Sequence, residues 1–311
     1  MPCAPLEWRM LIDSQEQTLF DALTEQNINL PAPDWPKLGE GVWGCVYDLG
    51  DGTLLKTIRK QGGLGSGQSK WARERHVLEK LSSLPIKGFD IPEFLGAGEL
   101  SLGATAWSAP LQGWIRMSHL GARTLHREQS VRGGRQQLGE EIGACLAHFH
   151  SLQIPSDSSL LTLTNPLLRT LDELDARLGR PDEIRLIHSL RSEIERQCQD
   201  IEPVLTHGDI HTENICRRET DELGLFDWAE CGMGPRETDL KHFELFPDLR
   251  DAVVLGYQIA SGTKINWDLY YLAATVNALT GMALHAGGTI RDEQRVRGLV
   301  DHCARQAGIS L

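Results

Sequence analysis

The sequence predicts an α+β protein, because strand patterns dominate its first third and helical patterns dominate the rest. Short apolar runs broken by glycine-rich turns lie between residues 37 and 58, and such runs are typical of β-hairpins. Apolar residues at helical spacing begin at Leu138, Ile142 and Cys145 and recur toward the C-terminus. A polar loop between two short apolar runs, at residues 204–228, interrupts the helical part.

Length and charge restrict the class of protein. The 311 residues are enough for one large domain or two lobes with an ample core. The 31 basic and 43 acidic residues give a formal charge of −12, which disfavours a nucleic-acid-binding role. This charge suits a cationic substrate, although acidic residues that only keep an enzyme soluble give the same composition.

The chain shows no pattern of secretion, zinc binding or membrane insertion. Charged residues interrupt the N-terminus, so it does not resemble a signal peptide. The seven cysteines lack zinc-site spacing, which favours reduced thiols in a cytoplasmic protein. The most apolar stretch, residues 269–286, contains polar residues and predicts a buried helix. We therefore expect a cytoplasmic protein without a nucleic-acid or membrane partner, and its oligomeric state is left open.

Residues 1–36 predict an N-terminal helical extension followed by a linker. Leu19, Phe20 and Leu23 share one face of the helix, and a proline-rich segment then breaks it. We expect this extension to pack on the strands that follow, and its role is left open.

A glycine-rich loop comes next, with Gly39, Gly41 and Gly44 in the pattern GxGxxGxV. A further Gly-Asp-Gly turn follows, so the loop joins strands and does not open a helix. Such glycines let backbone amides approach phosphates, although a plain glycine-rich hairpin would look the same. Lys56 lies in the third strand as the candidate phosphate ligand, and Lys60 is the alternative.

The predicted helix after this sheet has Glu74 on its apolar stripe. A carboxylate on a buried face requires a cation, because an unpaired buried charge is costly. Lys56 is the predicted partner. The alternative is a surface glutamate that pairs with Lys70 or Lys80.

The polar loop at 204–228 contains the strongest signal. Asp209 and Asn214 lie between two short strands, and Asp227 ends the second one. Such oxygen ligands suit Mg²⁺ that is bound together with substrate phosphates. Asp209 is then free to accept a proton from a hydroxyl. Aspartate and asparagine are also common turn residues, so the order and spacing, rather than the residue types, carry this interpretation.

The order of these residues, with His-Gly-Asp at 207–209 and Phe-Asp-Trp at 226–228, resembles the aminoglycoside phosphotransferase family, which includes choline kinases. The resemblance covers residues 37–285. It implies a two-lobe protein-kinase-like fold, with a small antiparallel β-sheet lobe at 37–120 for nucleotide. The mainly helical lobe at 121–311 would then hold the catalytic loop and the acceptor.

The resemblance also implies roles for individual residues. Asp209 would be the catalytic residue, and Asn214 and Asp227 would bind Mg²⁺. His207 and Asp239 would brace the catalytic loop, whereas contacts of His211 with substrate or metal are left open. The cofactor-binding residues would be Gly39, Gly41, Gly44, Lys56, Glu74 and, through the hinge backbone that bonds adenine, Ser118 and Leu120.

The predicted function is therefore ATP-dependent phosphorylation of a hydroxyl on a small molecule, with GTP as a possible donor. Aminoglycoside, choline-like, sugar and amino-alcohol acceptors are left open. Acidic residues after Asp227 would form a rim for a cationic acceptor, or else a solvated face. A nucleotide-binding regulator without transfer activity is the alternative, and the short segment before Asp239 disfavours a protein kinase. The four acidic residues of this predicted rim are Glu230, Glu237, Glu244 and Asp248.

Overall fold

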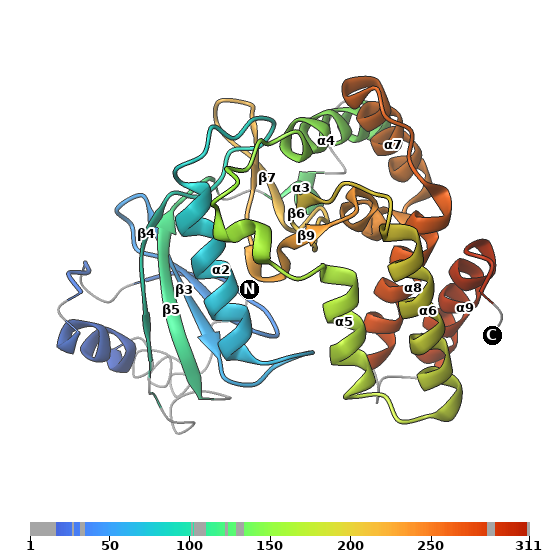
Figure 1. Cartoon of the computed structure of the whole chain (residues 1–311). Coiled ribbons are helices and arrows are strands. Elements are labelled where there is room, and N and C mark those ends of the chain that lie inside the picture. Colours follow the sequence, from blue (N-terminus) through green and yellow to red (C-terminus); the bar gives the residue numbers. More distant parts are fainter. Residues whose placement is uncertain are drawn as a thin grey trace. The chain divides into compact units, whose positions relative to one another are not determined.

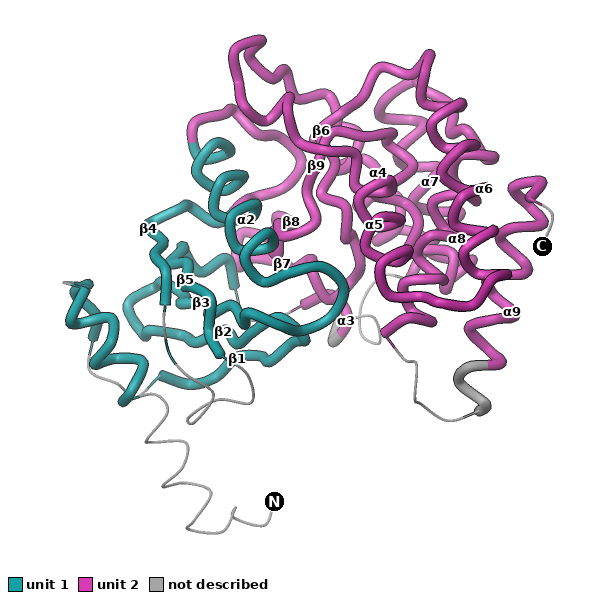
Figure 2. Tube along the Cα trace, turned by 60° about the horizontal axis from the view of Figure 1, so that its bottom comes forward, with its two compact units in different colours: residues 1–82, 92–122 teal, residues 83–91, 123–311 magenta. Residues whose placement is uncertain are grey.

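The computed structural model divides the chain into two compact units (Figure 2). Unit 1 consists of Met1–Ser82 and Pro92–Ala122, and unit 2 consists of Ser83–Ile91 and Arg123–Leu311. The predicted N-terminal extension therefore belongs to the same unit as the sheet. The residues that the structure describes are 17–26, 28–31, 35–100, 102, 110–121, 124–128, 134–284 and 290–309.

Unit 1 is built on a five-stranded antiparallel sheet with the order β1-β2-β3-β5-β4. Helix α2, Gly67–Leu81, packs against β3, β4 and β5 (Figure 1). Ser66 caps this helix by accepting a hydrogen bond from the backbone of Ser69. The strands are β1 Lys37–Glu40, β2 Gly44–Asp48, β3 Thr53–Arg59, β4 Phe94–Glu99 and β5 Leu111–Ser118.

A helix over residues 17–25 packs on the sheet of unit 1, as predicted. Leu19 and Leu23 are fully buried in one apolar cluster with Leu55 of β3 and Trp114 of β5. Successive side chains of a strand point to opposite faces, so Lys56 leaves β3 on the other face, toward α2. The sheet of unit 1 is thus covered on both faces (Figure 1).

Unit 2 is mainly helical, which confirms the α+β class of the chain. Helix α4 packs along α7, and α8 packs against α5, α6 and α9 (Figure 1). The predicted helical stripe that begins at Leu138 lies in α4, and the apolar stretch 269–284 lies in the buried helix α8. The helices are α3 Leu125–Glu128, α4 Gly134–His150, α5 Pro166–Asp175, α6 Pro181–Cys198, α7 Pro247–Ser261, α8 Trp267–Leu284 and α9 Ile290–Gln306.

Two small antiparallel sheets lie between α6 and α7 in the sequence and hold the polar loop. Strand β6, Val204–Thr206, pairs with β9, Gly232–Gly234. Strand β7, Ile215–Arg217, pairs with β8, Leu223–Leu225. The two predicted strands are therefore present as β6 and β8, but each pairs with a strand that the sequence did not indicate. Short 3₁₀ helices complete the region: η1 Ser159–Thr162, η2 Trp228–Glu230, η3 Arg236–Asp239 and η4 Lys241–Leu245.

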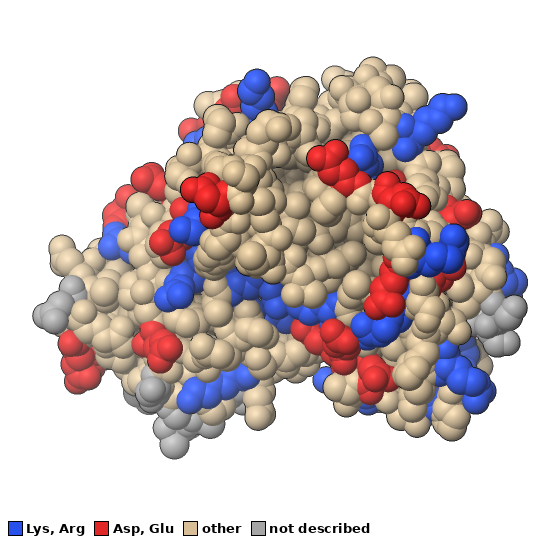
Figure 3. Space-filling view, in the orientation of Figure 1, with Lys and Arg blue, Asp and Glu red and all other residues tan. Residues whose placement is uncertain are grey.

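The surface of the chain is charged (Figure 3), and its described helices are not long and apolar enough to suggest a membrane span. Acidic and basic side chains are interspersed on the face shown in Figure 3. Within the described part of the chain, no helix is both long and apolar enough to cross a bilayer.

Candidate active site

The loop between β6 and β7 begins with a turn that only glycine accommodates. Gly208 has φ = +84°, a left-handed conformation that side chains disfavour. A Cβ atom at this position would lie 2.3 Å from the carbonyl oxygen of Glu230. The backbone therefore turns sharply just before Asp209 and presents that side chain from a fixed position.

Asp239 holds this turn in place through hydrogen bonds to its backbone, as predicted. Its carboxylate accepts hydrogen bonds from the backbone N–H of His207 at 2.9 Å and of Gly208 at 2.7 Å. The side chain is completely buried, and His150 Nε2 lies 3.0 Å from Oδ2. Burial raises the pKa of Asp239, but His150, His207 and the N–H of Gly208 together outweigh it and leave the pKa below its usual value.

His207 is a second brace, also as predicted. Its Nδ1 accepts from the backbone N–H of Asp209 at 3.3 Å, so Nε2 carries the proton and donates to the Phe226 carbonyl at 3.0 Å. The ring packs edge-on against Trp228. Burial lowers the pKa of His207, which favours the neutral ring that these two contacts require.

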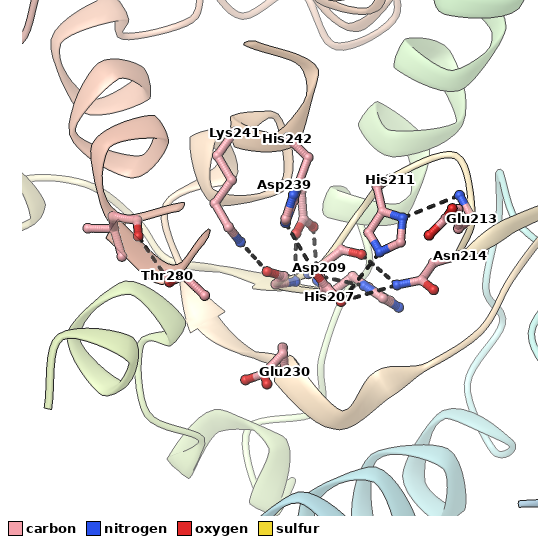
Figure 4. Close-up of polar contacts among 12 residues, drawn as sticks. His207, Asp209, His211, Glu213, Asn214, Glu230, Asp239, Lys241, His242 and Thr280 are labelled. Atoms are coloured by element: carbon pink, nitrogen blue, oxygen red, sulfur yellow. Dashed lines mark hydrogen bonds and ion pairs between the residues drawn. The ribbon is translucent and has the colours of Figure 1, made fainter. Parts of the chain in front are cut away.

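The Asp209 carboxylate is surrounded by nitrogen atoms (Figure 4). Its Oδ1 lies 3.0 Å from His242 Nε2, whereas its Oδ2 lies 3.6 Å from His211 Nε2. Asn214 Nδ2 donates to Oδ2 at 3.2 Å. Burial raises the pKa of Asp209, but the contacts with His211 and His242 outweigh it and hold the pKa well below the usual value. The carboxylate is therefore ionised at neutral pH.

Two residues that contact this loop, Lys241 and His242, were missed by sequence reasoning. They begin η4, directly after Leu240. Lys241 Nζ donates to the carbonyl of Gly208, and its burial lowers its pKa. The only available signal was a pair of polar residues after Asp239, and it did not distinguish a buried contact from a solvated turn.

Asn214 and Asp227 lie at the same end of the β7–β8 pair. Asn214 donates through Nδ2 to the backbone carbonyl of Asp209 at 2.9 Å, and its own carbonyl accepts from Phe226 N at 3.2 Å. Asp227 follows β8 with φ = 71°, a left-handed conformation that is uncommon outside glycine and is found at functional sites. The structure thus brings Asp209, Asn214 and Asp227 together, as their spacing predicted.

The chemistry of these side chains fits Mg²⁺. Asn214 uses its Nδ2 on Asp209, which leaves the amide oxygen as its ligand atom. Among the residues that the structure describes, no group of three His, Cys, Asp or Glu side chains is placed to hold a metal ion. Mg²⁺ in nucleotide sites needs only one or two carboxylates, because phosphates and waters complete its shell.

In unit 1, the structure places Lys56 and Glu74 in contact. Both carboxylate oxygens of Glu74 lie 2.8 Å from Lys56 Nζ, and the two side chains are 1% and 12% exposed, respectively. The alternative residue Lys60 is exposed. Lys70 lies over the ring of Trp43, with 5.6 Å between Nζ and the ring centroid. The predicted pair therefore forms, and Glu74 is buried, unlike the surface glutamate of the alternative.

The three loop glycines lie where β1 turns into β2. Gly39 is in β1, Gly44 begins β2, and Gly41 N donates to the Gly44 carbonyl at 2.9 Å. A Cβ atom on Gly44 would lie 1.7 Å from the carbonyl oxygen of Thr57. The loop is thus a tight turn that packs directly on β3. Its role toward phosphates stays a prediction.

Backbone hydrogen bonds reduce the number of predicted hinge residues that could donate to adenine. Ser118 N donates to Glu93 O at 3.0 Å, and His119 N donates to Gly52 O at 3.0 Å. Neither N–H is then available as an adenine donor. Of the two residues that were predicted, the donor function would have to come from Leu120, which stays a prediction.

The model of the phosphotransferase enzyme family matches residues 46–285, well over half of the 311 residues. The chain belongs to this family. The prediction of a phosphotransferase enzyme is thereby confirmed. No curated protein matches the chain.

Solved structures show that this phosphotransferase has the kinase-like fold that was predicted. It is similar to the GDP complex of wild-type aminoglycoside 2'-phosphotransferase-IIIa, with 13% identity, TM-score 0.63 and coverage of 94% of this chain and 99% of that chain. It is also similar to the streptomycin-ATP-APH(2")-IIa ternary complex, with 14% identity, TM-score 0.60 and coverage of 100% of both chains. Spectinomycin phosphotransferase APH(9)-Ia, in complex with ADP and spectinomycin, is similar with 14% identity, TM-score 0.51 and coverage of 94% of this chain and 97% of that chain.

Two acidic residues of the predicted rim do not form a rim in this phosphotransferase. Glu237 and Glu244 are only 3% and 9% exposed. Glu237 accepts from Asn266 N at 2.9 Å, and its burial raises its pKa. Glu244 accepts from Tyr270 Oη at 2.9 Å and from Arg250 at 3.0 Å. The rim interpretation is wrong for these two, because each is a buried structural carboxylate.

The other two acidic residues, Glu230 and Asp248, differ in their exposure to solvent. Glu230 is half-buried and pairs with Arg169 at 3.3 Å, and Arg169 also donates to the Glu230 carbonyl. Asp248 is exposed in the first turn of α7. Asp248 is therefore the solvated member of the predicted set.

Proposed function

We propose that this chain transfers the γ-phosphoryl group of ATP to a hydroxyl of a small molecule. The observation that carries the proposal is the Asp209 carboxylate on a loop that Asp239 and His207 hold in place, adjacent to Asn214 and to the end of β8. The solved relatives named above bind GDP, ATP or ADP in their titles, which supports a nucleotide donor and leaves GTP as an alternative.

The proposed division of labour follows the residues. Asp209 would accept the proton of the acceptor hydroxyl as that oxygen forms its bond to phosphorus and ADP leaves. Lys56, fixed by Glu74, would hold the nucleotide phosphates. Asn214 and Asp227 would hold Mg²⁺, which neutralises phosphate charge when bound. Residues 37–120 would thus serve the nucleotide, and residues 121–311 would serve catalysis and the acceptor.

We further propose an amine-bearing acceptor, such as an aminoglycoside or amino alcohol. The support is the charge of −12 and the titles of structural relatives that bind kanamycin, gentamicin or streptomycin. Glu237 and Glu244 are buried and contribute nothing to this support.

An ADP-release screen is expected to find an acceptor among hydroxyl-bearing amines. Matched pairs that differ by one amine, such as glucosamine and glucose, separate charge from shape, and mass spectrometry of the product confirms transfer. Each acceptor is run with ATP and with GTP. Turnover of neutral sugars without any turnover of amines would contradict the cationic acceptor. Binding of Mg²⁺-ATP without transfer or hydrolysis would favour a regulator.

Lys56 and Glu74 are expected to act as one unit in catalysis. Each single alanine variant should lower kcat/KM for nucleotide, and the double variant should cost little more, because residues that work together are non-additive. The matched control is the ion pair Arg191–Asp172 on α6 and α5, at 2.6 Å, whose removal should leave activity unchanged. Fully additive losses at Lys56 and Glu74 would show that the pairing does not matter to the reaction.

A cytoplasmic location also stays a proposal. The six cysteines within the described residues are all unpaired, which agrees with a reducing compartment.

A further inference from the structure

The segment Asp239–His242, which we call the brace segment, contacts three consecutive residues of the catalytic loop. Asp239 holds two backbone N–H groups there, and Lys241 holds the carbonyl of Gly208. His242 is the only one of these three whose side chain reaches the Asp209 carboxylate itself. No step of the proposed reaction uses His242.

The geometry of His242 is that of a partner for one carboxylate oxygen. Its Nε2 is buried 3.0 Å from Asp209 Oδ1, a close polar contact without the alignment of a full hydrogen bond, and the side chain is 17% exposed. Burial lowers the pKa of His242 to about 4, so the ring is neutral and carries a single N–H at neutral pH. The ring of His211 lies 5.4 Å away, between centroids, on the Oδ2 side.

The other carboxylate oxygen already has a partner. Asn214 Nδ2 donates to Asp209 Oδ2 at 3.2 Å and also to the Asp209 carbonyl at 2.9 Å. The terminal torsion of an aspartate is broad when no contact fixes it. Asn214 and His211 both lie on the Oδ2 side, so a contact on Oδ1 adds the second anchor that fixes the carboxylate plane.

We propose that His242 is a positioning residue that fixes the plane of the Asp209 carboxylate from the Oδ1 side, so that Oδ2 faces the acceptor hydroxyl in a constant orientation. This inference rests on the proposed function of Asp209. Its physical basis is that a small misplacement of a catalytic group costs a large part of the rate. A residue that only filled space would need no nitrogen at this place.

Kinetics of two variants test the role. His242→Leu is expected to lower kcat by about 10- to 100-fold while KM for Mg²⁺-ATP is unchanged, because the ring contacts Asp209 and not the proposed Mg²⁺ ligands Asn214 and Asp227. His242→Gln places an amide near Nε2 and should recover most of the rate. His188→Leu is the matched control, because that histidine is exposed on α6. A normal kcat in His242→Leu, or no recovery in His242→Gln at equal melting temperature, would overturn the proposal.

A double variant separates positioning from general packing. In the Asp209→Asn background the carboxylate is already gone, so His242→Leu should cause little further loss. A full further loss would mean that the ring acts elsewhere.

A spectroscopic readout keeps this inference distinct from the proposed function. The imidazole ¹⁵N and ¹H signals of His242, assigned by their absence in His242→Gln, should shift in Asp209→Asn, and those of His188 should not. If the wild type transfers to no acceptor, the proposed function fails while this measurement still decides the contact. Unshifted His242 signals would overturn the positioning role even in an active enzyme.

Discussion

Asp209→Asn is expected to lower phosphoryl transfer by about 10²- to 10⁴-fold, the usual scale for a general base, and to leave Mg²⁺-nucleotide affinity near wild type. The carboxylate is held ionised by its contacts with His211 and His242, so it can accept a proton at neutral pH. The amide of the variant has the same shape but cannot accept that proton. The loop itself should stay in place, because Asp239 and His207 hold it through backbone groups.

The measurement combines single-turnover kinetics with nucleotide calorimetry on the same variant. Asp200→Asn is the control, because Asp200 is exposed at the end of α6 and lies outside the proposed site. A variant that keeps an established transfer rate would remove Asp209 from its catalytic role. A variant that loses nucleotide binding together with transfer would mean that Asp209 belongs to the nucleotide site.

The sequence predicted those parts of the site whose residues lie close together in the chain. Asp209, Asn214 and Asp227 could be found from order and spacing, because a short loop between β6 and β7 and the end of β8 bring them together. Lys56 and Glu74 could be found because a strand and a helical stripe each point their side chains in a predictable direction. Order and spacing along the chain were enough for the first set, and local periodicity was enough for the second.

The parts that were missed depend on tertiary contacts. Lys241 and His242 reach the loop from η4, a single short turn more than thirty residues beyond Asp209, and such a turn has no periodic pattern. Strands β7 and β9 are as short as β6 and β8, but β7 ends in Arg217 and β9 is Gly-Met-Gly, so neither forms the apolar run that predicted the other two. The polar composition of the segment after Asp227 could not tell an exposed carboxylate from one that is buried against Arg250.

Asp227→Asn is expected to weaken Mg²⁺-dependent ATP binding sharply and to abolish most transfer. Asp227 would supply the charged ligand to Mg²⁺, and an amide is a much weaker ligand for a hard cation. Asparagine is the informative replacement, because the residue has φ = 71° and asparagine tolerates this left-handed conformation. Alanine would add a backbone cost of about 1–2 kcal/mol, which would mix instability with ligand loss.

The chain offers a matched control for that backbone cost. Asp221 also has a positive φ, 69°, but it lies in the β7–β8 turn and its side chain is 84% exposed. Asp221→Ala should therefore lose stability without losing nucleotide, whereas Asp227→Asn should lose nucleotide without losing stability. Calorimetry with ATP, in Mg²⁺ and in chelator, gives the first quantity, and thermal melting gives the second. Equal affinity of wild type and Asp227→Asn in Mg²⁺ would refute the metal assignment, because the charge would then contribute nothing to the bound nucleotide.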